Sequence, residues 1–449
     1  MSPPSGPFRV CLLHPALPGG PAVHRMIRTI HRAQFVLAEA DFLLQNAAVH
    51  VCDPGRISRI EPSHAKPSGS DVRVIDWGKA LIMPGLVNSH THLELSLLAG
   101  CIRETTSFVE WLSQVVQERR AWTPEHYADS VRAGAARALR SGTTLVADIS
   151  ASGLSRQALQ PERIRKAVFE EAVGLAPEQA AESVAAVERR LQGAEPDPLI
   201  TLGVSPHAPY SVSPKLYREL AALARRRGIL MTTHVAETRE ELEFLESGTG
   251  PFTGFLSSLG ALPDGWVPPK LDPVPYLEVL GVLEQSPLLA HCNYLDSHSV
   301  AIIQRTHSSV AFCPRSHAYF GHENHPVRQC LDLGINVALG TDSLASNDSL
   351  SMIDEMRFLY RTRRDLKCEE IFRMATLNGA TALNLGRVLG RLRRGYWADM
   401  TVLKLPEDVG GRNFLAHILE GAGECIATIV RGEIVWQRDE HTGSSATAT

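Results

Sequence analysis

Eight short apolar runs recur along the middle of the chain, and stretches with helical spacing separate them. The runs lie at residues 85–92, 143–150, 165–174, 199–207, 229–237, 287–294, 309–317 and 335–343. Strands that alternate with helices are typical of a parallel sheet covered by helices. Eight such strands within about 270 residues match the size of a closed (β/α)₈ TIM barrel. The sequence therefore predicts an α/β protein built on a TIM barrel.

An open, doubly wound sheet is the alternative arrangement of the same strands. Nucleotide-binding sheets of that kind carry a glycine-rich phosphate loop after the first strand. Neither GxGxxG nor GxxxxGK[ST] follows residues 85–92 in this sequence. The closed barrel is therefore the favoured prediction.

Both flanks of the barrel are rich in short β-type runs separated by Asp, Pro and Gly. We predict that residues 26–82 and 388–440 combine into a small β-sandwich domain and that residues 83–387 form the barrel. The first 25 residues are interrupted by Pro and Gly, so we expect a disordered leader there and not a signal peptide. A second disordered segment is expected at residues 441–449, which are small and polar.

Charge and cysteine content narrow the class of partner. The chain has 45 basic and 49 acidic side chains, a net charge of −4, which provides no strong field for nucleic acid or an anionic membrane. No run approaches the roughly 18 apolar residues of a membrane helix. The eight cysteines include no CxxC pair, which favours reduced thiols and a cytoplasmic location. A small molecule is the expected partner.

Histidine or aspartate stands at the carboxyl end of five predicted strands, where active sites of TIM barrels are built. These residues are His90, His92, His207, His234, His291 and Asp342. His90 and His92 are two residues apart on one strand, so both imidazoles point to the same face and can reach one ion. With His234 and Asp342 they would supply three nitrogens and one oxygen. That set predicts one divalent metal ion per chain, Zn²⁺ first, with Fe²⁺ or Mn²⁺ as alternatives.

Several strings occur together in a recognisable order: MPGLVNSHTHLE, SPHAPYSVS, THVAET, AHC and LGTDSLASN. In this respect the sequence resembles the amidohydrolase superfamily, in particular its metal-dependent deaminase and chlorohydrolase branch. Within the branch it looks most like aminodeoxyfutalosine deaminase-type proteins, and next most like methylthioadenosine/S-adenosylhomocysteine deaminases. No Lys ends the third or fourth strand, so the bridging carboxylated lysine of dinuclear members is absent.

The resemblance implies hydrolytic deamination of an adenine-bearing nucleoside by a metal-bound hydroxide. A chlorohydrolase, or an amidohydrolase for another heterocycle of the guanine, 8-oxoguanine or triazine type, is the alternative. A barrel without catalytic activity is a more remote one, because such proteins usually lack part of the ligand set. A homodimer is expected only by analogy with similar proteins.

The resemblance also assigns catalytic roles. Glu237 matches the proton shuttle of the family, with a surface salt bridge to Arg239 as the alternative interpretation. His291 would contact the hydroxide. Asp342 would bind the metal through one oxygen and accept a proton from the water through the other.

Four further residues are candidates for binding substrate. His207 matches a position that reads the substrate ring, and Glu94 could bind a ribose hydroxyl or a ring nitrogen. Arg315 offers a planar fork for a carboxylate, and His317 follows it on the same loop. The alternatives are a His207 that staples its own loop and solvated side chains at Glu94 and Arg315. We also expect residues 248–275 to form either a lid or a loop packed on its own aromatic side chains.

Overall fold

The computed structural model describes residues 27–63, 72–192, 197–407, 409 and 414–439. The predicted leader at residues 1–25 and the predicted tail at residues 441–449 lie outside these residues. None of the helices within the described ranges has the length and apolar character needed to cross a membrane.

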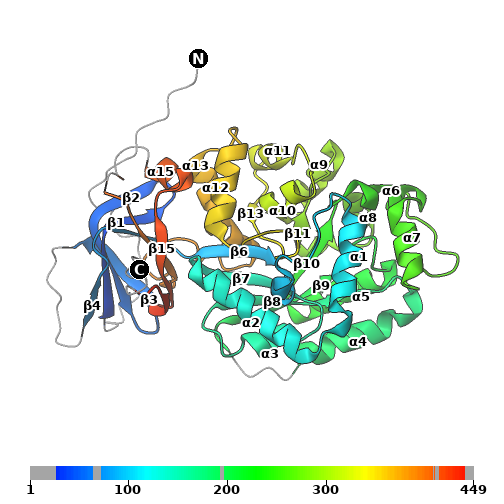
Figure 1. The fold of residues 1–449 in the computed structure, drawn as a ribbon, viewed down its shortest axis with the longest axis horizontal. Helices are drawn as coiled ribbons and strands as arrows, with labels where there is room; N and C mark the ends of the chain where they lie inside the picture. Colours follow the sequence, from blue (N-terminus) through cyan, green and yellow to red (C-terminus); the bar gives the residue numbers. More distant parts are fainter. Residues whose placement is uncertain (1–26, 64–71, 193–196, 408, 410–413, 440–449) are drawn as a thin grey trace, which may run out of the picture.

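Eight parallel strands form the centre of the molecule (Figure 1). They are β6 (Leu86–Thr91), β7 (Thr143–Ser150), β8 (Arg165–Ala172), β9 (Ile200–Pro206), β10 (Leu230–Val235), β11 (Leu288–His291), β12 (Ser309–Phe312) and β13 (Val337–Leu339). Each strand pairs with its neighbour in chain order. The circle closes where β13 meets β6, because Ser89 Oγ donates to the Leu339 carbonyl at 2.7 Å and Thr341 N donates to the His90 carbonyl at 3.1 Å. The TIM barrel prediction is confirmed.

Helices surround the strands. They are α1 (Phe108–Glu118), α2 (Pro124–Arg140), α3 (Ser155–Leu159), α4 (Ala180–Leu191), α5 (Pro214–Arg227), α6 (Arg239–Ser247), α7 (Pro251–Ser258), α8 (Pro273–Val279), α9 (Ser297–Arg305), α10 (Pro314–Tyr319), α11 (Val327–Asp332), α12 (Met352–Thr362), α13 (Cys368–Met374), α14 (Leu377–Ala382) and α15 (Phe414–Glu420). Short 3-10 helices stand at Leu93–Leu98 (η1), Arg119–Ala121 (η2), Pro177–Gln179 (η3) and Leu283–Gln285 (η4).

Local sequence signals set the ends of these helices, as α5 illustrates. Ser213 accepts a hydrogen bond from the Leu216 amide at 3.2 Å, and Pro214 occupies the first helical position. Gly228 ends the helix at φ 60°, a left-handed conformation that suits glycine. Val204 of β9 and Leu220 of α5 are fully buried in one apolar cluster, which holds the helix against the barrel.

The two flanks build one further sheet beside the barrel. Its strands are β1 (Ile27–Glu39), β2 (Phe42–Cys52), β3 (Arg56–Pro62), β4 (Arg73–Asp76), β5 (Ala80–Pro84), β14 (Met400–Lys404), β15 (Glu424–Val430) and β16 (Glu433–Gln437). The order is β16-β15-β14-β5-β1-β2-β3, with β4 paired to β1. Antiparallel pairing of β5 with β14 joins the flanks, and all eight strands form one connected mixed sheet. The expected domain from both flanks is confirmed, and its exact boundaries stay a prediction.

A buried ion pair links the sheet to the barrel. Arg165 of β8 contacts Asp399, the residue before β14, through two N···O distances of 2.6 and 3.2 Å. The two side chains are only 6% and 2% exposed. Asp399 also accepts the Arg431 amide at 2.9 Å, and the guanidinium groups of Arg165 and Arg431 lie over the Trp397 ring. Because the Asp399 carboxylate is buried and contacts both the barrel and the sheet, we expect its charge to contribute more to the stability of the fold than a surface ion pair does.

We expect the Asp399→Asn variant to lose about 3 kcal/mol of unfolding free energy, because the Arg165 charge stays buried without its counter-charge. Urea unfolding followed by fluorescence measures this loss. Asp129→Asn is the control, since the Asp129–Arg132 pair is exposed and should contribute less than about 0.5 kcal/mol. Equal urea midpoints for Asp399→Asn and the wild-type protein would refute the role given to this pair.

Candidate metal centre and catalytic site

A cavity opens at the carboxyl ends of the barrel strands. Its polar lining consists of His92, Glu94, Arg119, Glu171, His207, His234, Glu237, His291 and Asp342. Six of the residues predicted from strand ends and motifs therefore share one cavity with Glu94, while His90 lies deeper, with 1% of its surface exposed.

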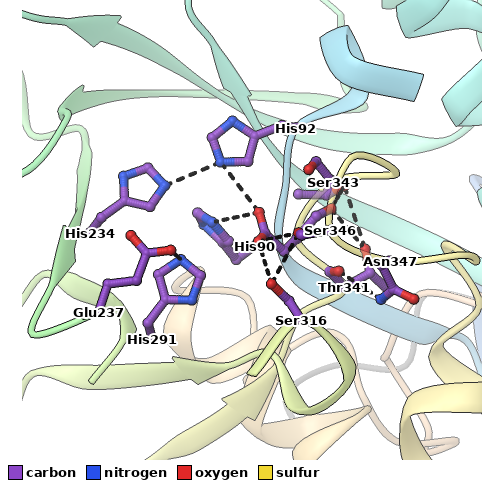
Figure 2. A network of polar contacts seen from close by, with 12 residues as sticks. His90, His92, His234, Glu237, His291, Ser316, Thr341, Ser343, Ser346 and Asn347 are labelled. Carbon is purple, nitrogen blue, oxygen red and sulfur yellow. Dashed lines mark hydrogen bonds and ion pairs between the residues drawn. The ribbon is translucent and has the colours of Figure 1, made fainter. Parts of the chain in front are cut away.

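Four side chains converge at the base of this cavity (Figure 2). His92 Nε2 lies 3.1 Å from His234 Nε2, and Asp342 Oδ1 lies 3.7 Å from His92 Nε2 and 3.9 Å from His90 Nε2. His90 and His92 come from the end of β6, His234 from β10, and Asp342 follows β13. One nitrogen each from His90, His92 and His234 lies within 4.8 Å of the others, as do single atoms of His90, His291 and Asp342.

The hydrogen bonds around the cluster leave its nitrogens free to bind a cation. His234 Nδ1 lies 2.8 Å from the His207 carbonyl, which can only accept, so Nδ1 carries the proton and Nε2 keeps a lone pair. Both ring nitrogens of the buried His90 have no hydrogen-bond partner in the described residues. Burial lowers the pKa of His90, His92 and His234, which keeps the imidazoles neutral. Three neutral imidazoles and one carboxylate fit a divalent metal ion.

Two serines orient Asp342, the fourth residue of the cluster. The hydroxyls of Ser316 and Ser346 donate to Asp342 Oδ2 at 2.7 and 2.9 Å, which leaves Oδ1 facing the histidines. Burial alone would raise the pKa of Asp342, but the nearby imidazoles and the Ser316 hydroxyl outweigh it, and the pKa falls below its usual value. Asp342 is therefore an anion in the site. Neither serine was identified from the sequence, because only the tertiary fold brings them to the carboxylate.

Strained backbone accompanies the strand ends. Ala236, His291, Cys292 and Asp342 adopt φ values of 51°, 68°, 54° and 58°. Residues with a Cβ rarely occupy this left-handed region, and such strain concentrates at functional sites. The turns direct the side chains of His291 and Asp342 into the cavity, where a regular strand would not place them.

Glu237 lies opposite the cluster of ligands. Its side chain is buried, and Oε1 lies 3.3 Å from His291 Nε2. Burial, with the charges of Asp342 and Glu241 as further causes, raises the pKa of Glu237 well above its usual value. Burial likewise lowers the pKa of His291 to about 3. The surface salt bridge considered for Glu237 is excluded, since its carboxyl faces the cavity.

Glu241 holds the backbone that carries Glu237. Its carboxylate accepts the amides of Ala236 at 3.2 Å and Glu237 at 2.8 Å, while Asn293 Nδ2 donates to the Glu237 carbonyl at 2.9 Å. Glu241 is fully buried, and burial raises its pKa to about 8. Glu241 could not be identified from the sequence, because it looks like an ordinary first-turn glutamate of α6, and only the folded backbone shows which amides it accepts.

His207 and Glu94 both line the cavity, but the His207 imidazole and the Glu94 carboxylate differ in how many of their polar atoms can still bind a ligand. His207 Nδ1 lies 2.6 Å from the Ser211 hydroxyl, so its own loop fixes the ring and leaves Nε2 for a ligand. Glu94 is 2% exposed and its carboxylate accepts hydrogen bonds from Ser150, Ser152 and Ser155, including the Ser152 hydroxyl at 2.6 Å. Glu94 is therefore not the solvated side chain considered as the alternative: the serine hydroxyls all donate to Oε1, and the Ser152 amide donates to Oε2. Its role in binding substrate stays a prediction.

The positions of Arg315 and His317 do not support the prediction that they bind substrate. The Arg315 guanidinium pairs with Asp348, and its amide donates to Glu355 at 3.1 Å, so it does not line the cavity. His317 packs edge-on against Phe312 and His322 outside the cavity lining. Both expectations came from their position after the seventh strand, where α10 turns the side chains away. The arginine that does line the cavity is Arg119.

Aromatic side chains close the cavity on the side of α1. Phe108 and Trp111 of α1 and Tyr210 line it, and Trp111 Nε1 donates to the Ala345 carbonyl at 2.8 Å. Phe252 stacks behind Tyr210 with ring centroids 4.1 Å apart, and Trp266 stacks on Phe244. The aromatics of residues 248–275 therefore pack within the protein and support the wall, which favours the second of our two interpretations.

Metal loading should be measurable without any substrate. We expect about one zinc ion per chain in the wild-type protein and a large loss of bound zinc in His90→Ala, determined by elemental analysis after dialysis. At free zinc 100-fold above its dissociation constant, binding should stabilise the fold by about 2.7 kcal/mol and raise the melting temperature. His298→Ala is the control, since His298 is exposed on α9. Retention of zinc by His90→Ala would show that the ligand set is wrong.

Comparison with known proteins supports the same family that the motifs indicated. The Amidohydrolase family matches residues 81–435. A 5-methylthioadenosine/S-adenosylhomocysteine deaminase from Pelotomaculum thermopropionicum is 31% identical over 400 residues, which cover 85% of this chain and 87% of the relative.

Solved structures share the fold. The Helicobacter pylori aminofutalosine deaminase in complex with methylthio-coformycin superimposes with a TM-score of 0.79 at 23% identity, covering 90% of this chain and 99% of the other. The atrazine chlorohydrolase from Arthrobacter aurescens in complex with zinc gives a TM-score of 0.76 at 21% identity, covering 90% and 94%. At these identities the likeness bears on the fold alone.

Proposed function

This chain belongs to the amidohydrolase family, and from that premise we propose that it hydrolytically deaminates an adenine-bearing nucleoside. The curated relative at 31% identity is named a deaminase of 5-methylthioadenosine and S-adenosylhomocysteine, which supports this substrate class. An aminodeoxyfutalosine-like nucleoside belongs to the same class.

The observation that carries the proposal is the position of Glu237. A buried carboxyl of raised pKa lies 3.3 Å from His291 and faces the cluster of His90, His92, His234 and Asp342. A carboxyl of raised pKa gains and loses its proton readily near neutral pH, so it can accept a proton from water and then return it to a leaving group. Deamination needs such a group, because the amine must depart as ammonia.

His90, His92, His234 and Asp342 would hold the metal ion, which lowers the pKa of a water towards neutrality when it is bound. Glu237 takes a proton from the attacking water and delivers it to the adjacent ring nitrogen, while the water oxygen forms a bond to the ring carbon. The new hydroxyl on the ring carbon then gives up its proton, which passes by way of Asp342 and Glu237 to the amine nitrogen. The carbon–nitrogen bond breaks, its electron pair leaves with the amine as ammonia, and the ring carbon keeps a carbonyl oxygen. The neutral His291, whose Nε2 lies 3.3 Å from Glu237 Oε1, contacts the attacking oxygen, and His207 Nε2 contacts the ring.

Finer features of the site belong to the same proposal. We propose a single Zn²⁺ per chain, supported by the donor set and by the zinc complex of a structurally similar enzyme. A cytoplasmic location and a homodimer are proposed from the sequence pattern and from analogy. Loss of a chloride or of another ring substituent is the alternative reaction, and the fold shared with atrazine chlorohydrolase supports keeping it in the test.

Ammonia release by zinc-loaded protein tests the proposal against methylthioadenosine, S-adenosylhomocysteine, aminodeoxyfutalosine, adenosine, guanine, 8-oxoguanine and atrazine. We expect turnover of one of the adenine nucleosides, and a loss of kcat/KM of about 10²- to 10⁴-fold in Glu237→Gln. Glu246→Gln is the control, because Glu246 is exposed on α6, away from the cavity lining.

Chloride release from atrazine without ammonia release from any nucleoside would contradict deamination and favour the alternative. Full activity in Glu237→Gln would contradict the proton shuttle. The amide of the glutamine is close in size to the carboxyl, so the variant tests proton transfer with little change in packing.

A further inference from the structure

Glu171 is a cavity residue that the proposed reaction does not use. It lies near the end of β8, lines the cavity and is 8% exposed. Its Oε1 atom is buried without a hydrogen-bond partner, and in the described part of the chain neither a hydrogen bond nor an ion pair reaches its carboxyl group. A buried carboxyl without a partner is costly, so this group indicates a ligand.

The position of Glu171 relates it to the substrate ring. One of its carboxylate oxygens, one nitrogen of His207 and one of His234 lie within 4.8 Å of one another. His234 has a free lone pair only on Nε2, and that nitrogen lies 3.1 Å from His92 Nε2 in the metal cluster. Because the single lone pair of His234 can bind only one metal ion, His234 cannot also join Glu171 and His207 in a second metal site. The side chains of Glu171 and His207 therefore lie beside the metal site and are available to bind the substrate.

Glu94 shows by contrast why Glu171 is available. Both carboxyls line the same cavity, but the hydroxyls of Ser150, Ser152 and Ser155 donate to Oε1 of Glu94 and the Ser152 amide donates to its Oε2. Arg119 also lines the cavity and forms no salt bridge with Glu171 among the described residues. Glu171 is thus a cavity carboxyl that retains its capacity to accept hydrogen bonds.

The donors that suit this carboxyl are hydroxyls next to the ring. In a nucleoside whose ring contacts His207, the sugar is attached to the ring itself, and its vicinal hydroxyls offer two donors to the two carboxylate oxygens. A hydroxyl both donates and accepts, so a diol also matches a carboxyl that carries a proton. We propose that Glu171 selects ribonucleosides by hydrogen-bonding the vicinal hydroxyls of the ribose. This inference rests on the proposed function, because it names how the same site reads its substrate.

Paired substrates test the inference. In the wild-type protein, kcat/KM for the ribonucleoside should exceed that for its 2′,3′-dideoxy analogue, and Glu171→Ala should shrink this ratio by about 10- to 100-fold. Glu171→Ala should lower kcat/KM for the ribonucleoside and leave kcat/KM for the dideoxy analogue little changed. Glu171→Asp, which keeps a carboxylate, should recover part of the ratio between the two substrates. If Glu171 had only a structural role, Glu171→Ala would lower kcat/KM for both substrates by a similar factor.

Glu170→Gln is the matched control. Glu170 precedes Glu171 on β8 and lies 3.6 Å from Arg190 of α4, so its side chain points to the opposite face of the strand. This variant should keep the wild-type ratio. An unchanged ratio in Glu171→Ala, with intact turnover, would overturn the inference and leave the proposed function standing.

Binding separates failure of the inference from failure of the proposed function. Calorimetry on zinc-loaded Glu237→Gln should show tighter binding of adenosine than of 2′,3′-dideoxyadenosine, and the added Glu171→Ala change should remove the difference. If no nucleoside is turned over by the wild-type protein and none binds to Glu237→Gln, the proposed function fails and the role of Glu171 falls with it. Equal binding of both nucleosides to Glu237→Gln would overturn the role of Glu171 alone.

Discussion

Closure of the barrel between β13 and β6 is the interaction on which the site depends. The amides of Thr341 and Asp342 both donate to the His90 carbonyl at 3.1 Å, and Thr91 Oγ1 donates to the Asp342 carbonyl at 2.9 Å. These bonds bring residues about 250 positions apart in sequence into one seam. His90 and Asp342, the first and last of the proposed metal ligands, therefore become neighbours only when the eighth strand has paired with the first.

The polar groups and the backbone of the site show that its geometry lowers the stability of the fold. His90 is buried, neither of its ring nitrogens forms a hydrogen bond within the described ranges, and four residues at the strand ends adopt positive φ. Each feature destabilises a protein that lacks a cation and a substrate at this point. A bound metal ion would repay part of that cost, and the same groups would then be held in place for reaction by Glu241, Ser316 and Ser346.

The sequence predicts most of the fold and the proposed ligand set. The alternation of strands and helices indicates the fold, and the position of His and Asp at strand ends indicates the ligands. Strands that alternate with helices predict the barrel, and His90-Thr91-His92 predicts two ligands on one face. Side chains whose role depends on a distant partner could not be predicted in this way. Asp348 determines where Arg315 points, and three serines after β7 or at its end determine that Oε1 of Glu94 already accepts hydrogen bonds within the protein. Glu171 was missed because adjacent glutamates 170 and 171 give no sign of which one faces the cavity.

The central claim is that four strand-end side chains bind one metal ion opposite Glu237. An anomalous difference map at the zinc absorption edge, from crystals of zinc-loaded protein, tests it most directly. The account predicts a single peak per chain, about 2.0–2.2 Å from one nitrogen each of His90, His92 and His234 and from Asp342 Oδ1. Two peaks, or one peak bound elsewhere with His90 still unpartnered, would contradict it.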